Sequence, residues 1–151
     1  MDGSVTIHID APPEKVWALV SDVTRIGEYS PETFEAEWAD GATGPAVGAR
    51  FRGHVKRNGR GPTYWKTCQV QVCEVGTAFA FGVETGGQVL NTWRYDLEAA
   101  GEGTDVTESF RLTPTLGLRL YWAALGWSRG RTNRDGMRMT LERMKAELER
   151  R

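Results

Sequence analysis

Glu108 is the residue whose chemistry and position suggest a functional site. It alternates with Val106 and Phe110 in a stretch typical of a β-strand, so parity places its carboxyl group on the apolar face. An ionised carboxylate is costly there unless it is paired or reached by water. Three roles follow, in order of preference: a buried structural anchor paired with an arginine, a group that binds a polar ligand atom, or a general acid or base.

Tyr95 is the second candidate. It shares an apolar strand face with Trp93 and Leu97, where its phenol could orient a ligand or exchange a proton. If the protein is an enzyme, Glu108 and Tyr95 are therefore the predicted catalytic residues, acting as acid and base without a metal. Three arginines in the predicted strands, by contrast, take the opposite parity from the aromatic residues, and none is clearly available inside. They are Arg52, Arg94 and Arg111.

Metal, redox and nucleic-acid functions find little support. The only histidines, His8 and His54, stand alone in separate strand patterns, so we predict no metal and no cofactor. Cys68 and Cys73 lie in one predicted strand, too far apart to form a disulfide and on opposite faces, which indicates free thiols. A net charge of -1 gives no global attraction to nucleic acid. Without a signal peptide or a membrane-spanning run, we expect a cytoplasmic protein.

The elements that must position these residues form one predicted domain, residues 1–151, of the α+β class. A strand pattern over 4–10 changes at Pro12-Pro13 into an amphipathic helix, and a second short helix is expected over 24–30. Six further strands follow, one of them, residues 63–75, long and bent. A helix over 131–150 closes the chain. Seven antiparallel strands can bury their apolar face only by curling around that last helix.

These motifs resemble the START-like (SRPBCC, helix-grip) superfamily, and more narrowly its polyketide cyclase/dehydrase and lipid-transport branch. The resemblance covers nearly the whole chain and rests on five motifs besides the Met- and Leu-bearing last helix. They are Ala11-Pro-Pro-Glu-Lys-Val-Trp17, Ser30-Pro31, Val47-Gly-Ala-Arg-Phe-Arg-Gly53, Trp93-x-Tyr95-x-Leu97 and Thr107-Glu108-Ser109.

The resemblance implies a deep hydrophobic cavity under the C-terminal helix, whereas the residues alone leave a cavity and a dense core open, with the dense core as the default. Our first hypothesis is a protein that binds or transports a lipid, a polyketide or an aromatic metabolite. The predicted lining is Phe51, Val70, Phe79, Phe81, Trp93, Tyr95, Glu108, Phe110, Met137 and Leu141.

Two alternatives remain. The second hypothesis is an enzyme, an aromatase/cyclase or dehydratase. The resemblance implies that an aromatase/cyclase orients its substrate with a pocket arginine and a tyrosine, and no arginine of this chain clearly maps to that role. The third hypothesis is an interaction module with a filled interior, acting through the apolar segment 116–127. That segment is either the first part of the last helix or a lid, and Leu118, Tyr121, Trp122 and Leu125 could contact a membrane or a partner.

Overall fold

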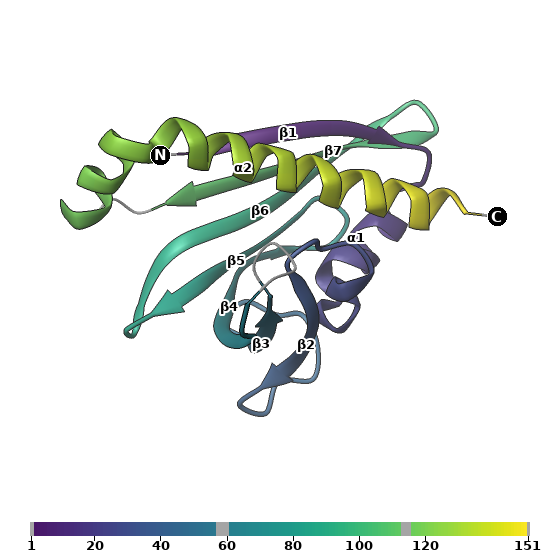
Figure 1. Ribbon diagram of the computed structural model, residues 1–151. Helices are drawn as coiled ribbons and strands as arrows, with labels where there is room; N and C mark the ends of the chain where they lie inside the picture. The colour runs from purple at the N-terminus through teal and green to yellow at the C-terminus, as the bar shows by residue number, and fades with distance from the viewer. Residues whose placement is uncertain (1, 57–60, 113–115, 151) are drawn as a thin grey trace.

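A seven-stranded antiparallel sheet and one long helix make up most of the molecule (Figure 1). The computed structural model describes residues 2–56, 61–112 and 116–150, and the side chains in these ranges except those of 116–132. In chain order the elements are β1 (Asp2–Ile9), α1 (Pro13–Ser21), the 3₁₀ helix η1 (Val23–Glu28), β2 (Thr33–Ala39), β3 (Arg50–Val55), β4 (Tyr64–Glu74), β5 (Ala78–Thr85), β6 (Gln88–Ala100), β7 (Gly103–Leu112) and α2 (Leu116–Glu149).

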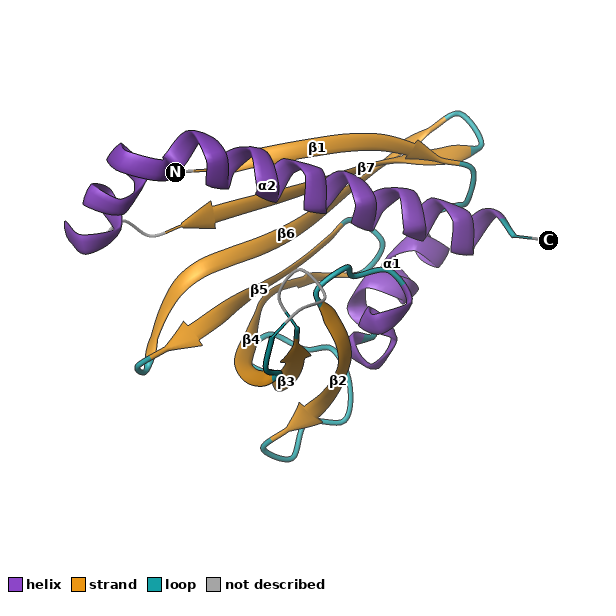
Figure 2. Cartoon of the chain, viewed as in Figure 1, coloured by secondary structure: helices purple, strands orange, loops and turns teal. Residues whose placement is uncertain are grey.

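The described strands follow the order β1-β7-β6-β5-β4-β3-β2, and every neighbouring pair is antiparallel. Figure 2 shows the sheet curling beneath α2, which lies along the β1 side. The predicted α+β class, the seven strands and the long closing helix are confirmed. The second short helix is a 3₁₀ helix over Val23–Glu28. It begins at Val23 because the Asp22 side chain caps it by accepting a hydrogen bond from the Thr24 N–H.

The sheet register aligns inward-facing side chains in rows across the strands. One row joins Phe79, Tyr95, Glu108 and Val5, from β5 to β1. The next row contains Phe81, Trp93 and Phe110. Directly opposed residues on antiparallel strands lie on the same face, so this register brings Glu108 beside Tyr95 among aromatic rings.

Two of the three register shifts in the described sheet place residues on a face other than the one the sequence pattern predicts. The pairing of β2 with β3 shifts between Thr33 and Glu35, so Phe34 lies on the outer face, 46% exposed, rather than inside with Ala36 and Trp38. There its ring contacts the ring of His54, with 4.4 Å between centroids. The predicted common face for these three β2 residues is therefore wrong, because one inserted residue reverses the parity.

The second bulge lies in β4, between Val70 and Val72. This bulge places the Cys73 side chain on the inner face of the sheet. There Cys73 pairs with Phe79 and packs against the core, as Cys68 does. The two cysteines consequently share one face, and the prediction of opposite faces is wrong. Both are free thiols, as predicted.

Helix α2 is longer than the pattern over 131–150 indicates, since it begins at Leu116 and includes segment 116–127. Its inner side buries Met137, Leu141 and Met144. Near its end, the Lys145 ammonium donates to the His8 carbonyl oxygen at 3.1 Å, which holds the helix to β1. No helix in the described part of the chain combines the length and the apolar character needed to cross a membrane.

Gly27 allows η1 to pack closely against β2, and substituting it tests that packing. A Cβ atom at this position would lie 2.2 Å from the Phe34 carbonyl oxygen, a backbone atom that cannot rotate away. We expect Gly27→Ala to lower the free energy of unfolding by about 1–3 kcal/mol. Gly44→Ala is the matched control, since its Cβ meets nothing within 4 Å. Urea unfolding measures both, and an equally stable Gly27→Ala protein would contradict the close packing.

Candidate ligand-binding cavity

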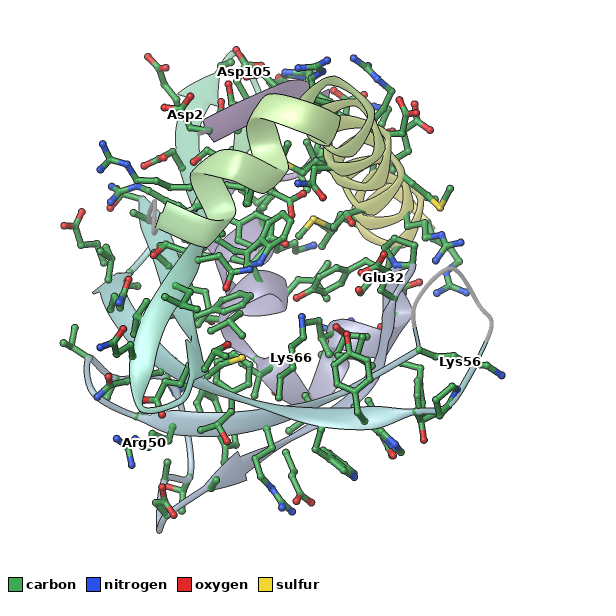
Figure 3. The ribbon with its side chains drawn as sticks, turned by 60° about the vertical axis from the view of Figure 1, so that its left-hand side comes forward. Asp2, Glu32, Arg50, Lys56, Lys66 and Asp105 are labelled. Atoms are coloured by element: carbon green, nitrogen blue, oxygen red, sulfur yellow. The ribbon has the colours of Figure 1, made fainter. Side chains whose placement is uncertain are left out.

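A cavity of about 470 Å³ lies between the inner face of the sheet, α2 and the segment after η1. Figure 3 shows side chains from these elements converging on this space. Aromatic and aliphatic groups form most of the wall. The residues that line it are Ile26, Tyr29, Ser30, Pro31, Glu32, Thr33, Phe51, Gly53, Val55, Lys66, Cys68, Phe81, Val83, Asn91, Trp93, Tyr95, Glu108, Phe110, Leu112, Asn133, Gly136, Met137 and Thr140.

The buried part of the wall carries one carboxyl group. Glu108 is 4% exposed, and its Oε1 accepts a hydrogen bond from the Tyr95 hydroxyl at 3.2 Å. Its Oε2 has no hydrogen-bond partner in the described part of the chain. A buried polar atom without a partner is uncommon in proteins, so this oxygen is a natural contact for a ligand.

Burial raises the pKa of Glu108 from its ordinary value of 4.5 to about 8, although the hydrogen bond from Tyr95 partly opposes the shift. Glu108 is therefore mostly protonated at neutral pH and can donate as well as accept. Burial also raises the pKa of Tyr95 and of Tyr29, and the charge of ionised Glu108 adds to both shifts. Both phenols keep their protons.

The preferred role for Glu108, an anchor paired with an arginine, is wrong for the described residues, because none of their cations pairs with it. The strand arginines point away from the cavity, as their parity predicted. Arg94 contacts Asp96 at 2.9 Å, and Arg52 pairs with Glu37 on the outer face. Two of the three predicted roles for Glu108 remain: ligand contact and acid–base chemistry.

Both histidines lie outside the cavity wall. His8 forms hydrogen bonds with Asp105 and Asp10, at 2.9 and 3.0 Å, on the solvent side of β1. His54 stacks on Trp65, with 4.2 Å between ring centroids. Within residues 2–56, 61–112 and 133–150, no three His, Cys, Asp or Glu side chains are arranged to hold a metal ion.

Residues 2–149 match the family described as polyketide cyclase/dehydrase and lipid transport. The chain belongs to this family. The match spans nearly the whole chain, and with the helix-grip architecture described above it confirms the resemblance to the START-like superfamily. No curated protein matches the sequence.

Solved structures share the family fold. The Polyketide_cyc-like protein Cgl2372 from Corynebacterium glutamicum is 32% identical, with a TM-score of 0.60 over 99% of this chain and 89% of its own. TTHA0849 from Thermus thermophilus is 16% identical, with a TM-score of 0.73 over 98% of this chain and 97% of its own. DR_A0006 from Deinococcus radiodurans is 18% identical, with a TM-score of 0.68 over 99% and 97%. The last two show the fold alone.

The sequence-predicted ligand residues divide into two groups in this family fold. Seven of the ten line the cavity, namely Phe51, Phe81, Trp93, Tyr95, Glu108, Phe110 and Met137. The other three, Val70, Phe79 and Leu141, are at most 1% exposed and belong to the core without lining the cavity. Parity found the inner face of the sheet correctly, but it could not separate the wall of a cavity from the core behind it.

The other lining residues were not predicted, among them Tyr29, Lys66 and Gly136. Lys66 carried a usable signal, since it has the same strand parity as Cys68 and Val70. Tyr29 follows η1, where no periodic pattern applies. Gly136 precedes Met137 on α2 and has no side chain to mark it. The proposed contact residues Leu118, Tyr121, Trp122 and Leu125 have side chains outside the described residues.

Proposed function

We propose that this protein binds or transports a hydrophobic small molecule, such as a lipid, a polyketide or an aromatic metabolite. The observation that carries this proposal is the cavity of about 470 Å³ with a mainly apolar and aromatic wall. Small-molecule pockets commonly have this size and this composition, with a few polar groups that fix orientation. Apolar burial would supply most of the affinity, while Glu108 and Tyr95 would orient the ligand.

Native mass spectrometry of protein purified without detergent tests this function, followed by solvent extraction of any bound compound. We expect reproducible adducts of hydrophobic molecules that are lost when the cavity is filled by mutation. An empty protein that also takes up no added fatty acid or aromatic compound would refute the proposal.

We also propose a cytoplasmic location, which the two free thiols support.

An aromatase/cyclase or dehydratase activity is the second candidate, and the state of Glu108 favours it. Its carboxyl group has a pKa of about 8, an unpartnered oxygen and a phenol at 3.2 Å. Protonated, it could donate its proton to a carbonyl oxygen of a polyketide. Ionised, it could remove a proton from the adjacent carbon, so one group would serve both transfers that aldol closure and dehydration need.

Substituting Glu108→Gln and Tyr95→Phe separates these two functions. An enzyme is expected to lose at least about a hundredfold in turnover of a candidate polyketide with Glu108→Gln, whereas a binder retains its ligand. Unchanged turnover in both variants would remove these residues from catalysis.

The third hypothesis, an interaction module with a filled interior, is weakened by the cavity. Liposome flotation tests the membrane contact that this hypothesis predicts for 116–127.

A further inference from the structure

Lys66 places a positive charge on the cavity wall. It lies on the inner face of β4, and Figure 3 shows its side chain extending from this strand into the space under α2. Its ammonium lies 5.6 Å from the centroid of the Tyr64 ring, and Tyr64 is 37% exposed. The charge is therefore near the mouth of the cavity, with its aliphatic stem along the wall.

No carboxylate of the described residues pairs with this ammonium. Lys66 forms no ion pair within 4 Å among the described residues, and the stretches outside the description contain no Asp or Glu. Its charge nevertheless acts on the cavity. Burial raises the pKa of the Cys68 thiol to about 12, and Lys66 is the nearby cation that opposes this shift.

The other charged groups of the cavity wall limit where an anion could bind. Glu108 lies at the buried end and offers no positive charge, and Glu32 lies on the segment after η1. Glu32 would repel an anion on its own side of the mouth. Lys66 is consequently the one described cation on the cavity wall where a negative ligand group would gain a charge-assisted hydrogen bond.

We propose that the ligand carries an anionic group, such as a carboxylate, that pairs with Lys66 at the mouth while its apolar body fills the aromatic interior. This inference rests on the proposed function and adds to it the polarity and the orientation of the ligand. The anion stays near solvent, where its desolvation cost is small, and the uncharged part enters first.

Two dyes with one aromatic scaffold test this assignment: anionic anilinonaphthalene sulfonate and neutral N-phenylnaphthylamine. Wild type is expected to bind both and to prefer the anion. Lys66→Met should reduce that preference by about tenfold without weakening the neutral dye, and Lys66→Arg should restore it. Lys56→Met is the matched control, since Lys56 is exposed and does not line the cavity, yet its loss changes the net charge equally.

The dye measurements distinguish a failure of the Lys66 assignment from a failure of the proposed function. An unchanged dye preference in Lys66→Met, or an equal loss in Lys56→Met, overturns the assignment to Lys66 and leaves the proposed function standing. If neither dye binds, or if filling the cavity through Gly136→Leu leaves both dyes bound, the cavity is not their site and both proposals fall. Glu32→Gln provides a check of opposite sign, because it should increase the preference for the anion.

Discussion

Glu108→Gln is expected to stabilise the protein by about 3 kcal/mol at pH 7 and to flatten its pH dependence, because the folded carboxyl group has a pKa of about 8 rather than 4.5. Each pH unit between the two pKa values changes the free energy of unfolding by about 1.4 kcal/mol, and pH 7 lies about 2.5 units above the ordinary value of 4.5. The amide has the same shape, carries no charge, and can still accept the Tyr95 hydrogen bond.

The sign follows from which state holds the proton. Below about pH 4.5 the carboxyl group is protonated in both states and makes no pH-dependent contribution to stability. Between pH 4.5 and 8 the unfolded chain releases a proton that the folded protein keeps, so the free energy of unfolding falls as pH rises. Above pH 8 the folded state also ionises, and the full penalty of a buried carboxylate remains.

Urea unfolding of both proteins at several pH values from 5 to 9 measures this effect. His8 adds a second pH-dependent contribution to stability, because its partners Asp105 and Asp10 raise its pKa. Its stabilising contribution is therefore present at low pH and lost as pH rises through that raised value. Both proteins retain His8, so its contribution cancels in their difference. Parallel pH curves would show that Glu108 is not the buried titrating group.

Gly136→Leu is expected to weaken binding of a hydrophobic probe by at least about tenfold while leaving the fold intact. Gly136 lines the cavity from α2, and a Cβ atom built on it meets no atom of the other described residues within 4 Å beyond its own helical turn. A leucine side chain would therefore extend into open space that the ligand needs. Leucine is also a better helix former than glycine, so we expect stability to rise rather than fall.

Gly136→Ala is the matched control. It gains helix propensity, about 0.5–1 kcal/mol, but fills almost none of the cavity, so it should bind the probe like wild type. Fluorescence titration with N-phenylnaphthylamine and thermal unfolding report both properties. Binding that is equally strong in the leucine and alanine variants would place the ligand elsewhere on the protein.

Alternation along the strands predicted the inner face of β5, β6 and β7, including Glu108 and its aromatic neighbours. These strands keep a regular register over the residues concerned, apart from an irregularity after Val83. The same reasoning failed for Phe34, which lies in a bulge, and for Cys73, which follows one. A bulge adds a single residue and leaves no clear mark in residue types, so parity reasoning alone cannot locate it.

The sequence by itself determined the family, the seven strands and the placement of Glu108 and Tyr95 on one apolar face, because strand parity and register depend on neighbouring residues. Only the tertiary structure decided that no described arginine pairs with Glu108, that Val70 and Phe79 are core, and that Lys66, Tyr29 and Gly136 share a cavity. Whether an inner face is covered or open depends on how the sheet curls around α2. Contacts between residues far apart in the chain fix that curvature, and local patterns do not encode them.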